Sequence, residues 1–176
     1  MGDVWVFGYG SLMWNPGFAH VETIQARLAG YRRALCIHSH VYRGTPQSPG
    51  LVLGLDRGGS CLGMAFRVPG ALEDEVIGYL RERELVTGVY LERRVGLRLQ
   101  DGRQVEAVTY VCDRHHEQYA GSLTVDAAAE IVAGASGRSG PNRDYVFNTL
   151  EHLRNMGIRD HWLESVAETI RLSSGS

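Results

Sequence analysis

The chain has 176 residues, of which 44% are hydrophobic and 22% are charged, which is the composition of one ordinary globular domain. Eighteen basic and twenty acidic side chains leave a net charge of −2, which does not favour nucleic-acid binding, so we expect no nucleic-acid partner. No apolar run approaches the roughly 18 residues that cross a membrane. The N-terminus lacks a signal-peptide pattern, so we expect a cytoplasmic protein with no membrane partner.

Glycine is the unusual residue, with 22 positions, but no Gly-X-Y period accompanies it, which excludes a collagen-like chain. We therefore expect the glycines to serve local turns. The three cysteines, Cys36, Cys61 and Cys112, form no CxxC pair, and an odd, dispersed number does not fit a secreted disulfide framework or a zinc knuckle. We expect three buried or half-buried thiols in a reducing compartment.

The first part of the chain is predicted to consist mainly of strands. Residues 4–7 are aromatic and β-branched and end at Gly8, which is typical of a buried strand that runs into a tight loop. A turn is expected at 43–50, which holds two prolines and two glycines. Further strands are expected within 30–43, at 51–55 and at 61–68, the last two joined through Gly58-Gly59.

Helices are predicted once in the middle of the chain and then at its end. The first is expected at about 71–85, where an acidic first turn suits the positive end of the helix dipole. Asp101-Gly102 predicts a β-hairpin with strands at 90–99 and 104–112. Three more helices are expected at about 126–135, 142–156 and 160–172. Strands and helices are thus largely segregated, which favours an α+β fold, and no linker is visible, so we expect a single domain over residues 1–176.

The densest glycine site is the segment Phe7-Gly8-Tyr9-Gly10-Ser11-Leu12, directly after the first strand. Met13 stands where the dinucleotide fingerprint and the nucleophile elbow need glycine, and no lysine completes a Walker loop. A glycine-flanked turn can point consecutive backbone N–H groups at one spot, where they bind an anion or an oxyanion. The alternative is a plain turn, which the local pattern alone favours.

Glu84 occupies a special position on the helix expected at 71–85. The apolar face of this helix consists of Leu72, Val76, Ile77 and Leu80. Glu84 lies four residues past the last of these, at the edge of the same face. A carboxyl at the border of a core is desolvated, so its pKa should rise, as a general base for an amine requires. The alternative is an ion pair with Arg81 or Arg83, or a frayed, hydrated helix end, and the residues alone favour that alternative.

The seven histidines do not have the spacing of metal ligands. His38 and His40 lie on one face of a strand, while His115 and His116 are adjacent in a polar segment, and no two histidines are paired at i and i+4. We therefore expect no metal site. Ser11 with one of these histidines would make a nucleophile–base pair, but no Asp–His spacing supports a catalytic triad.

Several segments, taken in order, resemble a known enzyme family. They are Val6–Trp14, Arg32-Arg33, Arg43–Val52, Tyr79–Tyr90 with its Arg83-Glu84 pair, and Ser139–Tyr145. Together they resemble the ChaC-type γ-glutamylcyclotransferases over nearly the whole chain, because the Tyr-Gly-Ser-Leu loop is combined with Arg-Gly-Thr-Pro and Arg-Glu. Many eukaryotic relatives carry Gly-Gly-Tyr soon after the Arg-Glu pair, whereas this chain carries Leu85-Val86-Thr87-Gly88-Val89-Tyr90.

The resemblance implies a small mixed β-barrel with surrounding helices and a helical C-terminal part. It also implies that the small-molecule substrate is glutathione, cleaved to 5-oxoproline and cysteinylglycine without a cofactor. By motif position, Glu84 becomes the catalytic acid and base, in agreement with the helical argument, and this agreement reverses the preference for a structural ion pair. The loop residues that would cradle the γ-glutamyl group are Tyr9, Gly10, Ser11 and Leu12.

Three more side chains are candidates for substrate binding, namely Arg43, Tyr90 and Tyr145. An arginine can hold a carboxylate through two parallel hydrogen bonds, and tyrosine hydroxyls can orient a substrate. The alternatives are a turn-stabilising arginine and tyrosines packed in the core with satisfied hydroxyls. Two other functions also remain open: a cyclotransferase for other γ-glutamyl-amino acids or γ-glutamylamines, and a non-catalytic small-molecule binding domain.

Overall fold

The chain folds into two compact units in a computed structural model that describes residues 2–174. The first, which we call the barrel unit, comprises the residues up to Arg33 and Leu55–Asp113. The second, which we call the helical unit, comprises Ala34–Gly54 and the residues from Arg114 onward. The predicted single domain stays a prediction. The strands β2 (Glu22–Ser39) and β3 (Gly50–Val68) each contribute residues to both units.

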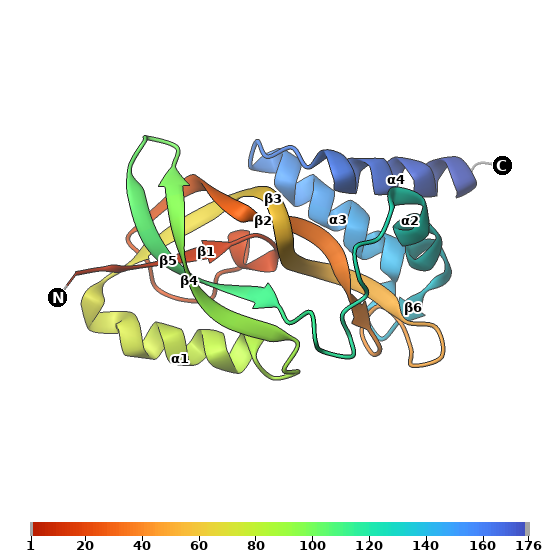
Figure 1. The fold of residues 1–176 in the computed structure, drawn as a ribbon, viewed down its shortest axis with the longest axis horizontal. Helices are drawn as coiled ribbons and strands as arrows, with labels where there is room; N and C mark the ends of the chain where they lie inside the picture. The colour runs from red at the N-terminus through yellow and green to blue at the C-terminus, as the bar shows by residue number, and fades with distance from the viewer. Residues whose placement is uncertain (1, 175–176) are drawn as a thin grey trace. The chain divides into compact units, whose positions relative to one another are not determined.

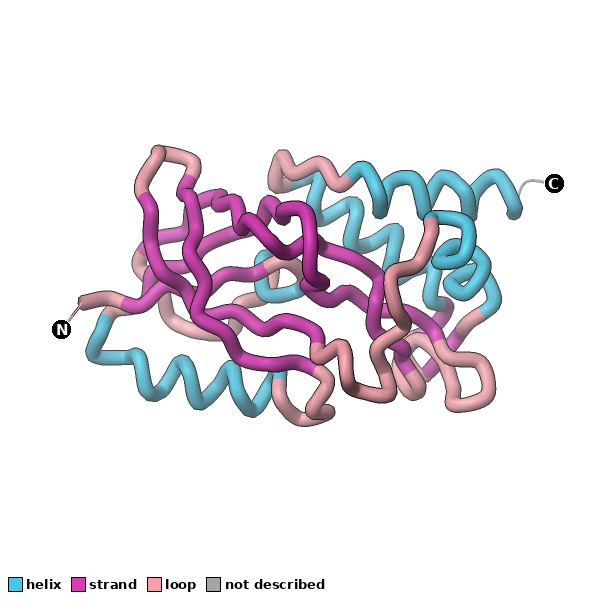
Figure 2. Tube along the Cα trace, viewed as in Figure 1, coloured by secondary structure: helices cyan, strands magenta, loops and turns pink. Residues whose placement is uncertain are grey.

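The barrel unit is a closed barrel with the strand order β1-β3-β2-β4-β5. Its other strands are β1 (Val4–Gly8), β4 (Tyr90–Leu99) and β5 (Gln104–Cys112). Strand β1 pairs antiparallel with β3, and β4 pairs antiparallel with both β2 and β5. Strand β1 also pairs parallel with β5, and this parallel pair closes the barrel. Figure 2 shows that, apart from one long helix, this unit is built mainly of strands. The predicted mixed β-barrel is confirmed.

Strand β1 is buried along its whole length, whereas parts of β2 and β4 alternate between a buried and an exposed face, following the two-residue period of a strand. On β2, Ala26 and Leu28 are buried and Arg27 between them is exposed. On β4, Leu97 is buried and Arg98 is exposed. Arg27 and Arg98 therefore stand on the outer face of the barrel wall.

Helix α1 (Glu73–Glu84) lies alongside the barrel strands (Figure 1) and follows a 3-10 turn, η2 (Gly70–Leu72). Its buried residues Val76, Ile77 and Leu80 belong to one apolar cluster with residues of β1, β3 and β5. The strand members of that cluster are Val4, Val6, Phe66, Val68, Val108 and Tyr110. Because this face of the helix packs on three strands, the last turn of α1, which carries Glu84, is fixed against the barrel.

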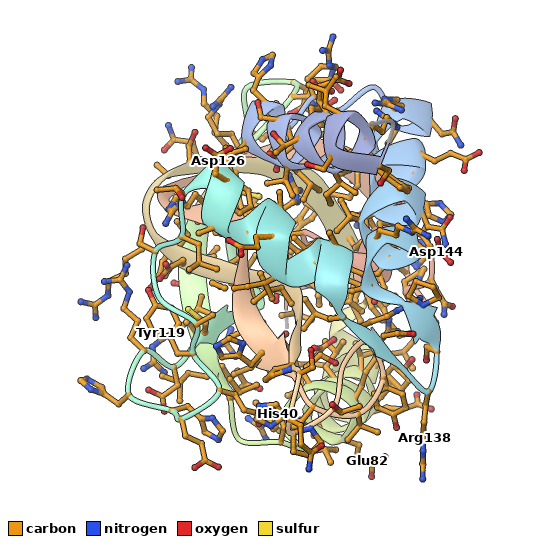
Figure 3. All side chains as sticks on the ribbon, turned by 90° about the vertical axis from the view of Figure 1, so that its right-hand side faces the viewer. His40, Glu82, Tyr119, Asp126, Arg138 and Asp144 are labelled. Atoms are coloured by element: carbon orange, nitrogen blue, oxygen red, sulfur yellow. The ribbon has the colours of Figure 1, made fainter. Side chains whose placement is uncertain are left out.

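The helices of the helical unit are α2 (Val125–Gly134), α3 (Asn142–Asn155) and α4 (His161–Ser174), which contact one another (Figure 1). Between α2 and α3 lies a short hairpin of β6 (Ser136–Gly137) and β7 (Gly140–Pro141). Figure 3 shows that Arg138, in the turn of this hairpin, extends away from the helices. The same view places Asp126 and Asp144 at the starts of α2 and α3, where the helix dipole favours negative charge.

Most of the predicted elements are confirmed. The hairpin strands are those expected, and each of the four helices begins and ends within two residues of its predicted bounds. All three cysteines are buried thiols, as expected. Among residues 2–174, no helix combines the length and the apolar character that crossing a membrane requires.

Three strand predictions are wrong. The strand expected within 30–43 begins at Glu22. The strands expected at 51–55 and 61–68 form one continuous strand, because Gly58 and Gly59, at φ 102° and 63°, let β3 bend without ending. The loop expected between the second and third helices contains the β6–β7 pair, whose register joins Gly137 to Gly140.

Candidate active site

The glycine loop forms a single 3-10 turn, η1 (Ser11–Met13), after β1. Its first internal hydrogen bond is donated by the Met13 N–H to the Gly10 carbonyl, at 2.9 Å. The amides of Ser11 and Leu12 precede that bond, so the turn itself does not use them. This geometry keeps open the predicted role of these amides in binding a substrate oxygen.

Arg33 fixes the start of this loop from inside the barrel unit. Its side chain is buried, with 6% exposure. The Nε donates to the Tyr9 carbonyl at 2.7 Å, and Nη2 donates to the Leu62 carbonyl at 2.6 Å. Sequence reasoning did not give Arg33 a role, although a charged residue directly before the apolar run 34–37 is a signal for one.

Arg83, in the last turn of α1, holds the same loop from the other end. Its Nη1 donates to the carbonyls of Asn15 and Pro16, at 2.7 and 3.2 Å, and to the Tyr79 hydroxyl at 3.1 Å. Its Nη2 donates to the Ser11 Oγ at 3.0 Å. One guanidinium thus ties the loop to the helix through three hydrogen bonds, while its bond to Tyr79 stays within α1. The local sequence pattern predicts an ion pair for Arg83 and gives no sign of its contacts with the loop.

Gly17 makes the approach of the loop to α1 possible. A Cβ at this position would lie 2.1 Å from the Tyr79 hydroxyl oxygen, and the residue adopts a φ of 73°, which disfavours any side chain. The backbone conformation therefore favours glycine here, and a side chain would also displace the Tyr79 hydroxyl. Tyr79 and Arg83 stand one helical turn apart and contact neighbouring parts of the loop.

Glu84 is the last residue of α1, and its side chain is 18% exposed. Burial raises the pKa of the Glu84 carboxyl, while the charge of Arg83, whose Nε lies 3.6 Å from Oε1, opposes that rise by a smaller amount. The expected direction of the pKa shift is confirmed. The alternative ion pair is also present with Arg83, whereas Arg81 pairs with Glu92.

Tyr110 of β5 is a further residue in the surroundings of Glu84. Its hydroxyl donates to Glu92 Oε1 at 2.8 Å, and Arg81 holds that carboxylate through two hydrogen bonds of 2.9 and 3.0 Å. Burial, the hydrogen bond to Glu92 and the negative charges of Glu92 and Glu84 all raise the pKa of Tyr110. The Tyr110 hydroxyl therefore stays protonated near Glu84.

The structure brings part of the predicted site together in the barrel unit. Arg83 contacts both Ser11 and Glu84, so the loop and the proposed base share one neighbour. Leu12 is 6% exposed and packs in the apolar cluster, so only its backbone is available to a substrate. Tyr90 is half-buried against the same cluster, and its role in substrate binding stays a prediction.

Arg43 and Tyr145 lie in the helical unit, where both contact the backbone. Arg43 Nη1 donates to the carbonyls of Ser139 and Pro141, at 2.9 and 3.2 Å, and its guanidinium lies 5.7 Å from the centre of the Tyr145 ring. The Tyr145 hydroxyl accepts from the Leu53 N–H at 3.0 Å. These contacts match the structural alternative for each residue, and their substrate-binding roles stay predictions.

Among residues 2–174, no three or more His, Cys, Asp or Glu side chains gather in a way that could hold a metal ion. The rings of His38 and His40 stack, with their centres 6.3 Å apart. Burial and the neighbouring His40 lower the pKa of His38.

A family model described as ChaC-like protein matches residues 4–173. The chain belongs to the ChaC family. Among its ChaC relatives, the glutathione-specific gamma-glutamylcyclotransferase of Escherichia coli K12 is 36% identical over 170 residues, which cover 97% of this chain and 74% of the relative. The human glutathione-specific gamma-glutamylcyclotransferase 1 is 30% identical, with 95% of this chain and 78% of the relative covered.

A solved yeast structure, described as a γ-glutamylcyclotransferase specific to glutathione, has the same fold as this ChaC protein. The TM-score is 0.83, with 97% of this chain and 96% of the yeast chain covered. The sequence identity is 24%, so this likeness bears on the fold alone. It agrees with the mixed barrel described above.

Proposed function

We propose that this protein is a γ-glutamylcyclotransferase that converts glutathione into 5-oxoproline and cysteinylglycine. Relatives that carry the name glutathione-specific gamma-glutamylcyclotransferase are 30–36% identical over nearly all of the chain. The observation that carries the proposal is the largely buried Glu84 carboxyl with its raised pKa, which Arg83 connects to the Ser11 loop. Such a carboxyl, next to a turn with unused amides, offers the base and the oxygen-binding groups that the reaction needs.

The proposed reaction is an internal aminolysis. The α-amino nitrogen of the substrate attacks its own γ-carbonyl carbon, the bond from that carbon to the cysteine nitrogen breaks, and a five-membered lactam forms. All atoms of glutathione remain in the two products, so no water or second substrate enters. Because both reacting groups belong to one molecule, the protein mainly selects the ring-closing conformer, for which effective molarities reach about 10⁵–10⁸ M.

Glu84 moves the protons of this reaction. An α-amine has a pKa of about 7.7–8.0, so much of it is protonated near neutral pH and cannot attack. The Glu84 carboxylate removes the proton from the attacking nitrogen and returns one to the leaving cysteine nitrogen. Burial, which raises the pKa of Glu84, strengthens it as a base and leaves its protonated form a usable acid.

The loop holds the γ-glutamyl group beside Glu84. The amides of Ser11 and Leu12 bind either the α-carboxylate or the oxygen that becomes negative in the tetrahedral intermediate, since both groups are oxyanions. Arg83 acts as a positioning residue, because it bonds to Ser11 and lies against Glu84. Arg33 has the same function at Tyr9.

The direct test is incubation of the purified protein with glutathione, with 5-oxoproline and cysteinylglycine measured by mass spectrometry. We expect the two products in equal amounts. Glutamate in place of 5-oxoproline would identify water as the nucleophile and overturn the ring closure. Glutathione that is bound but never cleaved would support a binding domain, and faster release of 5-oxoproline from γ-glutamylalanine would overturn the substrate assignment.

A serine hydrolase built on Ser11 is tested in the same assay. The Ser11 Oγ accepts a hydrogen bond from Arg83, so we expect it to position the loop and not to attack the substrate. Ser11→Ala should therefore retain 5-oxoproline release, whereas complete loss together with labelling of Ser11 by a serine-directed reagent would favour the hydrolase.

We also propose that the protein is cytoplasmic. The three cysteines are buried free thiols, which supports this location because free thiols are usual in a reducing compartment. Fluorescence microscopy of a tagged full chain in its native cell would test this location.

A further inference from the structure

The outer face of the barrel carries two arginines directly opposite each other. Arg27 of β2 and Arg98 of β4 are register partners in the antiparallel pair, and both are exposed. Like charges directly opposite each other on neighbouring strands are destabilising. The protein therefore tolerates an unfavourable charge pair on a chain whose net charge is −2.

No carboxylate among residues 2–174 neutralises this pair. Arg27 Nη1 donates to the Ser60 hydroxyl at 3.0 Å, which supplies no charge. The Arg98 side chain forms no hydrogen bond or ion pair with any other described residue. Glu106, the acidic residue beside the pair, already faces Arg94 at 3.9 Å. Two positive charges are thus left without a counter-charge of their own.

Two open hollows meet at the arginine pair. The larger has a volume of about 550 Å³, with Ala29, Gly96 and the Arg94-paired Glu106 among its lining residues. The smaller has a volume of about 220 Å³ and is lined in part by Gln25 and Gln100. Arg27 and Arg98 line both hollows. Short side chains at 29 and 96 leave room beside the two guanidinium groups for a bound molecule.

We propose that Arg27 and Arg98 form a binding site for a small dianionic oxyanion, of which a phosphoryl group is the representative. Guanidinium groups bind such oxygens through paired, charge-assisted hydrogen bonds. A dianion would convert the repulsion between the two arginines into attraction to a shared ligand. The larger hollow gives room for an organic group attached to the phosphoryl group. None of these residues takes part in the proposed cyclisation.

The test is binding of inorganic phosphate to the full chain, measured by calorimetry and by thermal unfolding against sodium chloride at matched ionic strength. We expect phosphate to bind and to raise the melting temperature beyond the chloride control. Arg27→Gln and Arg98→Gln should each weaken binding about tenfold or more, because each removes charge-assisted hydrogen bonds. The matched control is Arg143→Gln, an exposed arginine of α3, which should bind phosphate as the unmodified chain does.

A blocking variant tests the site independently of the arginines. Added atoms at Gly96 meet open space within 4 Å, so Gly96→Glu should fold, and its carboxylate should compete with phosphate for the pair. AMP and ATP as further probes separate a phosphorylated organic ligand, which should bind more tightly, from free phosphate. Phosphate binding that survives both arginine substitutions, or a melting shift that chloride reproduces, would overturn the proposal.

Discussion

Arg83 of the barrel unit and Arg43 of the helical unit make closely similar contacts. Each donates from Nη1 to two backbone carbonyls, and each lies against a tyrosine, Tyr79 for Arg83 and Tyr145 for Arg43. The difference is that Arg83 also reaches Ser11 and Glu84. The same kind of arginine contact therefore only stabilises a loop in the helical unit, whereas in the barrel unit it also connects a loop to the Glu84 carboxyl. An arginine in a motif does not by itself indicate substrate binding.

The largest expected effect comes from the ionisable group itself. Glu84→Gln keeps the size of the side chain and removes the proton transfer, so 5-oxoproline release should fall about 10²- to 10⁴-fold. Circular dichroism should show the same fold as the unmodified protein. Full activity in this variant would overturn the assignment of Glu84 as the base.

The two arginines provide a matched pair of variants. Arg83→Met should reduce kcat/KM about 10- to 100-fold, because it removes hydrogen bonds that hold the loop at Ser11. Since the Arg83 charge lowers the pKa of Glu84, its loss should also move the rising, acidic limb of the pH–rate profile to higher pH. Arg83→Lys, which keeps the charge, should leave that limb near its original position.

Arg43→Met should instead lower stability by about 1–2 kcal/mol and leave kcat/KM of the folded protein within a few-fold of its original value. Urea unfolding and steady-state kinetics measure the two quantities separately. A clear rise in KM would contradict this difference between Arg43 and Arg83 and would support the substrate role that the sequence predicts for Arg43.

Substitution of Asn142, the first residue of α3, should affect stability and not activity. The Asn142 side chain is buried, accepts from the Leu51 N–H at 2.8 Å and donates to the Leu51 carbonyl at 2.9 Å. Asn142→Ala leaves both backbone groups without these partners, so the free energy of unfolding should fall by about 2 kcal/mol. Activity per folded molecule should be unchanged. A melting temperature equal to that of the unmodified protein would show that this anchor is dispensable.

The smallest expected effect is a gain of stability in Glu84→Gln. Because the pKa of Glu84 is raised on folding, the folded state binds more protons than the unfolded state between the two pKa values, so this carboxyl makes stability fall as pH rises through that window. A glutamine side chain does not titrate, so Glu84→Gln lacks this pH-dependent loss of stability. The variant should be more stable at pH 7, by about 1 kcal/mol or less, and the difference should disappear below the unfolded pKa of about 4.3. Thermal melts at pH 4 and pH 7 test this.

The sequence predicted the features that depend on local patterns. The Asp101-Gly102 hairpin and the helices follow from turn chemistry and periodicity, and the buried edge position of Glu84 follows from helical spacing. The passage of β3 through Gly58-Gly59 was missed because two glycines normally indicate a turn. The contacts of Arg33 with Tyr9 and of Arg83 with Ser11 join residues 24 and 72 positions apart, so no local pattern reports them.

The contact between Arg83 and the loop has a consequence for the order of folding. Ser11 leaves the ribosome before its partner in α1, which follows 72 residues later, and a contact of such long range must overcome the entropy of closing the chain between them. The loop therefore acquires its fixed shape late, when α1 docks on the barrel. A substitution that loosens this docking should abolish catalysis in a chain whose strands are still paired.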